Sequence, residues 1–286
     1  MSLCIDYALR SVRLILRYPS AIPHLISGIS SVNAHINNSV RQEYLRAPIE
    51  FKKSEGFEIY LEPKGSGISP LVAIIGTYEP EVTWIFKKVL KQGDRVIDIG
   101  ANIGWFTLLS ARIVGRSGLV VSFEPEPENF SLLTKSICKN RFSNVISFNE
   151  VVSDIDGSQM LNLSQRSDLH SIVHDFGGER ILVQASKLET VAKRLNLDRV
   201  DLVKIDVEGA EPQVISGMRS LVDDGRVLHM VIEWSPSVWA ANLELLSWLF
   251  EAFNIYRINH VSFSRFTKMK KETLPLTGAN LYLVKK

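Results

Sequence analysis

One run of residues constrains the fold of this chain more than any other: V-I-D-I-G-A-N-I-G-W-F-T, from Val96 to Thr107. The residues at 95–99 are apolar enough for a buried strand, and the pattern over 104–114 predicts a helix. Glycines between the two let the backbone turn sharply and approach a ligand without a Cβ in the way. This order predicts the ligand crevice of an open α/β sheet, at the carboxyl end of the strand.

The glycine turn has the spacing D-x-G-x-N-x-G, whereas a dinucleotide-binding turn has the spacing G-x-G-x-x-G. Asp98 stands first in it, where a carboxylate opposes a phosphate but suits a cofactor that carries an ammonium group and no phosphate. S-Adenosylmethionine is such a cofactor. The turn therefore favours a methyl donor, and its candidate cofactor-binding residues are Asp98, Gly100, Asn102 and Gly104.

A second apolar strand is predicted over 119–123, and Glu124 follows it directly. At the end of the neighbouring strand of a βαβ unit, a carboxylate can accept hydrogen bonds from both hydroxyls of a ribose. The structural alternative is that Glu124 begins a proline-rich turn and Asp98 caps the next helix. The paired spacing favours the cofactor-binding interpretation.

A third buried strand is predicted over 200–205, with Lys204, Asp206 and Glu208 at or just past its end. A buried ammonium group is costly unless a carboxylate meets it, so Lys204 should pair with Asp206 or Glu208. The alternative is that the acidic residues serve only the N-terminus of the helix predicted over 212–221.

Three motifs, Asp98–Gly104, Phe123–Pro125 and Lys204–Glu211, resemble in this order the FkbM family of S-adenosylmethionine-dependent methyltransferases. The resemblance covers residues 76–286. It implies an α/β fold of the Rossmann-like class I methyltransferase type, with a seven-stranded, mostly parallel sheet of order 3-2-1-4-5-7-6 flanked by helices. It also implies methyl transfer to a hydroxyl group, of a sugar, a glycan or a secondary metabolite.

Further cofactor contacts are implied by the resemblance alone. Tyr78-Glu79-Pro80 resembles the family's entry segment, which makes Glu79 a candidate. The adenine is expected near Ser153 and Asp154, after the strand predicted over 145–151.

Methyl transfer from a sulfonium is an in-line displacement, so a general base for the acceptor hydroxyl is expected. Asp206 is the first candidate, with Lys204 tuning its carboxylate, and Glu208 and Glu233 are its rivals at the same rim. A divalent metal ion such as Mg²⁺ is the other route: the same three carboxylates could hold it, and it would lower the pKa of the acceptor hydroxyl.

Other candidates have competing structural interpretations. His170 and His174 fall in a polar stretch over 165–178 that we expect to shape the acceptor site, and each could be a base, a metal ligand or a loop hydrogen-bonding group. Trp234 and Trp239 could form an apolar wall for the acceptor or belong to the core.

Composition narrows the function classes. With 286 residues, 45% of them apolar, the chain can bury one catalytic core and a smaller appendage. Its 33 basic and 31 acidic residues are spread along the chain, so a nucleic-acid acceptor is not expected.

Two distant cysteines, Cys4 and Cys138, fit a reducing compartment. Without a spanning apolar run or a signal peptide, we expect a soluble, cytoplasmic protein.

The N-terminal part lacks the family motifs, so we divide the chain into an extension over 1–80 and a methyltransferase domain over 81–286. Residues 3–18 have the pattern of an amphipathic helix with a basic stripe, which suits packing on its own domain or peripheral contact with an anionic membrane. A hairpin is predicted from strands over 57–61 and 71–75.

Two alternatives to a methyltransferase stay open at this point. An NAD-dependent oxidoreductase would use the same sheet, and a non-catalytic S-adenosylmethionine-binding protein would use the same crevice. The sequence predicts neither the acceptor nor the oligomeric state.

Overall fold

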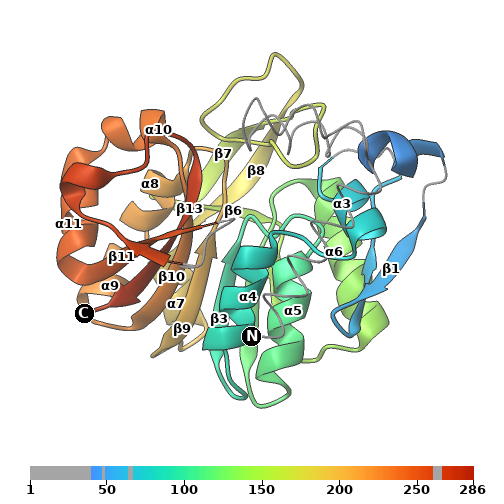
Figure 1. Ribbon diagram of the computed structural model, residues 1–286, viewed down its shortest axis with the longest axis horizontal. Coiled ribbons are helices and arrows are strands. Elements are labelled where there is room, and N and C mark those ends of the chain that lie inside the picture. The colour runs from blue at the N-terminus through green and yellow to red at the C-terminus, as the bar shows by residue number, and fades with distance from the viewer. Residues whose placement is uncertain (1–39, 47–48, 64–66, 260–265) are drawn as a thin grey trace.

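The computed structural model describes residues 40–46, 49–63, 67–259 and 266–286, and its centre is an eight-stranded sheet (Figure 1). Antiparallel pairs join β12, β11, β13 and β10, and parallel pairs join the rest. In spatial order the strands are β12 (Phe266–Lys268), β11 (Phe253–Ile258), β13 (Ala279–Lys285), β10 (Val227–Trp234), β9 (Val200–Ile205), β3 (Arg95–Ile99), β4 (Leu119–Phe123) and β5 (Val145–Phe148).

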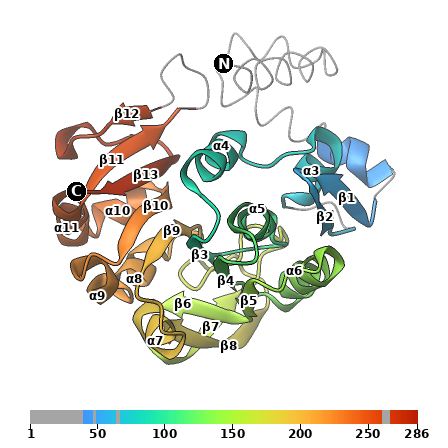
Figure 2. The same cartoon turned by 90° about the horizontal axis from the view of Figure 1, so that it is seen from below.

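Helices cover both faces of this sheet, as Figure 2 shows. One face carries α4 (Pro80–Val89), α5 (Trp105–Val114) and α6 (Pro127–Asn140), and the other carries α7 (Leu188–Arg194), α8 (Glu211–Ser216), α9 (Arg219–Asp223) and α11 (Leu243–Ala252), with α10 (Pro236–Ala240) before α11. Successive strand residues point to opposite faces, so Val96 belongs to one core cluster and Ile97 to the other. Both faces are therefore buried, as the continuous apolar strands predict.

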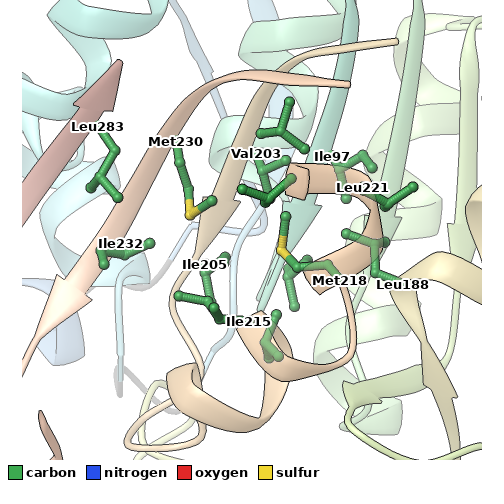
Figure 3. Packing of buried hydrophobic residues seen from close by; sticks show 14 of the residues in the cluster. Ile97, Leu188, Val203, Ile205, Ile215, Met218, Leu221, Met230, Ile232 and Leu283 are labelled. Atoms are coloured by element: carbon green, nitrogen blue, oxygen red, sulfur yellow. The ribbon is translucent and has the colours of Figure 1, made fainter. Parts of the chain in front are cut away.

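The cluster that contains Ile97 joins the sheet to α7, α8 and α9. Figure 3 shows apolar side chains of β3, β9 and β10 packed against Leu188 of α7, Ile215 of α8 and Leu221 of α9. Met218 lies between the last two helices and is fully buried. This packing holds the carboxyl ends of the parallel strands in one line.

The predicted fold class is confirmed, with one strand more than expected. Seven strands follow the order 3-2-1-4-5-7-6, and β12 adds an eighth at the edge beside β11. The predicted terminal pair is present as the antiparallel ladder of β11 and β13.

One predicted strand, over 145–151, is two strands in the structure. It breaks at Asn149, whose side-chain amide donates to the carbonyls of Glu124 and Pro125 and so bends the chain away from the sheet. The second piece, β6 (Glu150–Ser153), pairs with β8 (Arg180–Lys187), and β8 pairs with β7 (Gly157–Asn162) in a separate three-stranded sheet.

The predicted strand over 71–75 is wrong, because these residues form the helix α3 (Ser69–Ile75). Pro70 occupies its first turn, where a missing N–H costs nothing, and Gly76 ends it in the left-handed region at φ 77°. The hairpin lies earlier in the chain and pairs β1 (Phe51–Ser54) with β2 (Phe57–Tyr60).

The helix predicted over 212–221 is broken into α8 and α9 at Gly217. A Cβ at this glycine would lie 1.9 Å from the carbonyl oxygen of Ser153, so the chain turns here to let β6 pack closely.

The described residues before 80 share a core with the sheet. The ring of Phe57 packs edge-on to that of Trp105 with centroids 5.4 Å apart, and Tyr44 is buried in the same cluster. The predicted helix over 3–18 and Cys4 lie outside the described residues, and the domain boundary at 80 remains a prediction. In the described ranges, no helix is both long and apolar enough to cross a bilayer.

Candidate cofactor and catalytic site

A pocket opens at the carboxyl ends of β3, β4 and β9, where the three predicted motifs meet. It encloses about 880 Å³ of empty space, counting its open mouth. Its lining includes the glycine turn after β3, Glu124 after β4, and Lys204, Asp206 and Glu208 at the end of β9. The sequence therefore identified the three sides of one site.

The turn after β3 lies directly against the backbone of the β9 motif. The N–H of Asp206 donates to the carbonyl of Ile99 at 3.1 Å. Gly100 has φ +76°, and a Cβ there would lie 1.8 Å from the carbonyl oxygen of Asp206. Gly104 has φ +101°, and its Cβ would meet Leu133 of α6 at 2.5 Å. Gly100 is required by the close approach of the two backbones, whereas Gly104 is required by its left-handed φ, since its Cβ would meet only the movable end of the Leu133 side chain.

Glu124 is held at the pocket wall by backbone donors. Its Oε2 accepts from the N–H of Asn102 at 2.7 Å, and its Oε1 accepts from the N–H of Glu126 at 3.0 Å. The side chain is 5% exposed, and this burial raises its pKa to about 7 although both hydrogen bonds oppose the shift. The carboxylate is thus fixed in orientation before any ligand arrives.

Asp98 is fully buried inside the sheet and does not line the pocket. Its Oδ2 accepts a 2.6 Å hydrogen bond from the Thr107 hydroxyl, whereas Oδ1 has no hydrogen-bond partner among the described residues. Burial raises the pKa of Asp98, and the nearby Lys204 opposes that shift. Its predicted contact with the cofactor ammonium remains a prediction.

Lys204 is the buried cation of the site. Its side chain is 4% exposed, and Nζ donates to Asp206 Oδ2 at 2.8 Å and lies 4.9 Å from the ring centroid of Phe106. Burial alone would lower the pKa of Lys204, but the carboxylates of Asp206, Asp98 and Glu79 raise it. The predicted pairing of Lys204 is therefore with Asp206, whose side chain is 26% exposed at the pocket.

Two further carboxylates lie beside this pair. Ligand oxygens of Asp206, Glu208 and Glu233 all lie within 4.8 Å of one another, as the predicted cation site requires. Burial and the neighbouring acids raise the pKa of Glu208 to about 9 and that of Glu233 to about 8. Glu208 also has the left-handed φ of +52°, which turns the chain at the rim.

Glu79 approaches the same cluster from the start of α4. Its Oε1 accepts from Asn280 Nδ2 at 3.1 Å, while Oε2 is buried and has no hydrogen-bond partner within the described ranges. Burial, followed by the charge of Asp206, raises its pKa to about 7. The residue is near Asp206 and does not line the pocket.

Ser153 and Asp154 also do not line the pocket. Ser153 is fully buried, and its hydroxyl bonds to Asp154 Oδ1 at 3.0 Å. The wall on this side comes from Val151 and Val152, which directly precede Ser153 on β6. The adenine contact of Ser153 and Asp154 remains a prediction.

The polar stretch between β7 and β8 covers the pocket, and we call residues 164–174 the roof segment. Ser171 is tied down by its hydroxyl, which donates to the carbonyl of Glu208 at 2.7 Å. His174 packs on Gly209, where a Cβ would meet its Nε2 at 2.4 Å. His170 lines the pocket, and its Nδ1 accepts from the N–H of Ser164 at 3.0 Å.

Asn102 connects the cofactor turn to the roof segment. Its backbone is left-handed at φ +50°, and its Nδ2 donates to the carbonyl of Ser167 at 2.8 Å. The same carbonyl accepts from Nδ2 of Asn129, at the start of α6, also at 2.8 Å. The sequence motifs did not indicate Asn129; a polar residue in the first turn of a helix after the ribose carboxylate was the available signal.

Trp234 and Trp239 belong to the core and form no wall of the pocket. They are 3% and 0% exposed, and their rings stack with centroids 5.8 Å apart.

The residues of this crevice fit S-adenosylmethionine better than a dinucleotide. A fixed carboxylate at the end of β4 and an acidic interior suit a cofactor with a sulfonium, an ammonium group and no pyrophosphate. With the 3-2-1-4-5-7-6 sheet, they define a class I S-adenosylmethionine-dependent methyltransferase.

Comparison with known proteins identifies the family. The sequence model of the methyltransferase FkbM domain matches residues 98–257, more than half of the chain, and the chain belongs to this family. S-Adenosylmethionine is therefore its cofactor, and the oxidoreductase interpretation has no support.

Individual relatives are more distant. The chain is 27% identical over 144 residues to methyltransferase 1 of Beauveria bassiana, a match covering 43% of this chain and 57% of the relative. It is 26% identical over 175 residues to the 31-O-demethyl-FK506 methyltransferase FkbM of Streptomyces tacrolimicus, covering 50% and 66%. The chain thus spans less than two thirds of the length of either relative.

Among solved structures, the chain is similar to an S-adenosylmethionine-dependent O-methyltransferase of Thermotoga maritima. The two share 16% identity at a TM-score of 0.42, over 79% of this chain and 77% of the other.

Proposed function

We propose that this protein methylates a hydroxyl group of a small-molecule acceptor, a sugar, a glycan or a secondary metabolite, with Asp206 as the general base. The observation that carries the proposal is the ion pair of Lys204 and Asp206 at the edge of the cofactor pocket. It presents a carboxylate, paired with a buried cation, at the rim where the acceptor must enter.

Electrostatics favours Asp206 over its rivals. The raised pKa values of Glu208 and Glu233, about 9 and 8, mean that both carry protons near neutral pH and cannot accept another. S-Adenosylmethionine supplies an electrophilic methyl group bound to a sulfonium. Asp206 would take the hydroxyl proton as the acceptor oxygen bonds to the methyl carbon and the methyl–sulfur bond breaks, which leaves S-adenosylhomocysteine, and the proton then passes to solvent.

The charge of the rim supports a small-molecule acceptor. Among the described residues that line the pocket, Lys204 is the only lysine or arginine, and it is paired with Asp206, so the pocket offers no free cation to the phosphates of a nucleic acid. The name of the Streptomyces relative also specifies an O-demethylated natural product as its acceptor.

Binding of a divalent cation is a second role that we propose for the same carboxylates. Asp206, Glu208 and Glu233 offer oxygens within 4.8 Å of one another, a donor set that Mg²⁺ accepts, and a bound cation would displace the protons held by the two glutamates. Calorimetric titration with Mg²⁺ at pH 8 tests this role, with the Glu208→Gln, Glu233→Gln double variant as the control. Equal heats from both proteins would eliminate the site.

The reaction is tested first by binding and then by turnover. We expect calorimetry to show micromolar binding of S-adenosylmethionine and S-adenosylhomocysteine and none of NAD. A panel of hydroxylated glycans and metabolites, together with RNA and protein acceptors, is then screened for S-adenosylhomocysteine release. Methylation of RNA or protein alone would overturn the small-molecule proposal.

The base is tested with the Asp206→Asn variant on the acceptor so found. We expect turnover to fall about 100-fold or more while S-adenosylhomocysteine affinity stays within about threefold. Asp198→Asn, an exposed carboxylate on the surface, is the control and should leave both unchanged. Full turnover in Asp206→Asn would remove this residue as the base.

A further inference from the structure

We propose that Asn129 is a cofactor-binding residue: its amide oxygen accepts a hydrogen bond from one ribose hydroxyl, while its amide nitrogen holds the roof segment over the pocket. The inference uses the established cofactor and does not depend on the acceptor or on the base.

The amide of Asn129 can have only one orientation. Its Nδ2 lies 2.8 Å from the carbonyl oxygen of Ser167, which can only accept. Turning the amide over would place Oδ1 against that oxygen and repel it. The backbone is fixed as well, because the N–H of Asn129 donates to Oε2 of Glu126, the N-cap of α6, at 2.6 Å.

This orientation leaves Oδ1 as a buried acceptor on a residue of the pocket wall. Asn129 is 1% exposed and lines the pocket, and Oδ1 has no hydrogen-bond partner among the described residues. A buried acceptor without a donor is costly, so a ligand that brings a donor is favoured here.

The neighbours of Asn129 indicate which donor this is. Asn102 shares the Ser167 carbonyl with Asn129, and the N–H of Asn102 is bonded to Glu124. Asn129 and Glu124 are therefore linked through Ser167 and Asn102 at one end of the pocket. Both oxygens of Glu124 already accept a backbone hydrogen bond, so a division of the two ribose hydroxyls between Glu124 and Asn129 satisfies every acceptor.

The arrangement couples cofactor binding to the position of the roof segment. When the ribose binds Oδ1, the amide plane is fixed from both sides, and Nδ2 holds Ser167 more firmly. Asp168 and His170, the next pocket-lining residues of the roof segment, are then in place. Cofactor binding should therefore slow amide hydrogen exchange across residues 164–174.

The test measures affinities of S-adenosylhomocysteine and its 2′-deoxy and 3′-deoxy analogues by calorimetry. We expect the wild-type protein to bind one of the two deoxy analogues about tenfold more weakly than S-adenosylhomocysteine, because that analogue lacks the hydroxyl that contacts Asn129. In Asn129→Ala, S-adenosylhomocysteine should bind about tenfold more weakly, and the loss for that analogue should shrink to about twofold. For each analogue, the loss of affinity relative to S-adenosylhomocysteine is compared between the wild type and Asn129→Ala. If this loss is the same in the two proteins for both analogues, the proposal is overturned.

A matched variant separates this effect from loss of a buried amide in general. Asn144 is also buried and bridges two carbonyls, of Ala111 and Gly115, at 2.9 and 2.8 Å, but it does not line the pocket. Asn144→Ala should leave S-adenosylhomocysteine affinity within about twofold. The same weakening in Asn144→Ala would show that the effect is not specific to ribose.

Asn129→Asp keeps the proposal testable if the alanine variant does not fold. It retains an oxygen for the ribose but sets a second oxygen against the Ser167 carbonyl. We expect it to distinguish the deoxy analogue as the wild type does, while residues 164–174 exchange faster in the presence of S-adenosylhomocysteine. A variant with slow exchange and no discrimination would contradict the proposed division of the amide.

Discussion

Lys204 Nζ donates a 2.8 Å hydrogen bond to Asp206 Oδ2, two residues further along the chain. Lys204 also lies opposite Asp98 in the parallel ladder of β3 and β9, so its ammonium stands between a carboxylate inside the sheet and one in the pocket. One buried cation thus neutralises acidic groups of both the glycine turn and the pocket rim.

Removing this cation should destabilise the protein. Lys204→Met leaves Asp98 and Asp206 without their counter-charge, and breaking a buried pair in this way costs about 3 kcal/mol or more. Urea unfolding measures the loss. Lys187→Met, which removes an exposed pair with Glu189 at 4.0 Å, is the control and should cost less than about 1 kcal/mol. Similar losses in both variants would mean that Lys204 is not buried as described.

A methyl group at Gly100 should strongly destabilise the protein. Its Cβ would lie 1.8 Å from the carbonyl of Asp206, so the turn and the β9 motif would have to separate. Gly177→Ala has a similar φ, +68° against +76°, with no atom within 4 Å, so it isolates the strain of the backbone alone. We expect a loss of about 1 kcal/mol for Gly177→Ala and several times more for Gly100→Ala in thermal unfolding.

The cofactor-free protein should lose stability as pH rises from about 6 to 9. Glu233 and Glu208 have pKa values raised to about 8 and 9, so the folded state holds protons that the unfolded chain releases above about pH 4.5. Unfolding is then favoured at higher pH. The Glu208→Gln, Glu233→Gln double variant should show a flatter dependence of its melting temperature on pH, and an unchanged slope would contradict the raised values.

Cofactor affinity should increase with pH over a lower range. Glu124 has a pKa raised to about 7, chiefly by burial, and only its ionised form is a strong acceptor for a ribose hydroxyl. Between pH 6 and 8 the ionised fraction rises about tenfold, and the affinity for S-adenosylhomocysteine should follow it. Glu124→Gln should bind weakly at every pH, whereas surface variant Glu179→Gln should behave as wild type. A pH-independent wild type would exclude Glu124 as the ribose acceptor.

The sequence predicted the fold wherever local pattern and tertiary environment agree. The strands at 95–99, 119–123 and 200–205 are buried on both faces, so their apolar runs reported their structure directly. The run at 71–75 is equally apolar but forms a helix, because periodicity cannot separate a short buried strand from a short buried helix.

The site was predicted where it follows strand ends and missed where it depends on long-range contacts. Glu124 and Asp206 come directly after strands, so topology alone brings them together. Asn129 acquires its position from Ser167, 38 residues later, through a backbone carbonyl that no side-chain pattern records. The break at Asn149 is of the same kind, since its partners are the carbonyls of Glu124 and Pro125.

The roof segment has a property that bears on how enzymes of this type diversify. It belongs to the longer connection between Asn162 and Arg180, which are paired partners on β7 and β8. The two asparagines that fasten it hold the main-chain oxygen of residue 167, which every amino acid possesses. Apart from Ser171 and His170, whose side chains also hold the segment, its side chains can change without breaking these two hydrogen bonds. We expect exchange of those positions between relatives to change the acceptor while the methyl-donor site stays unaltered.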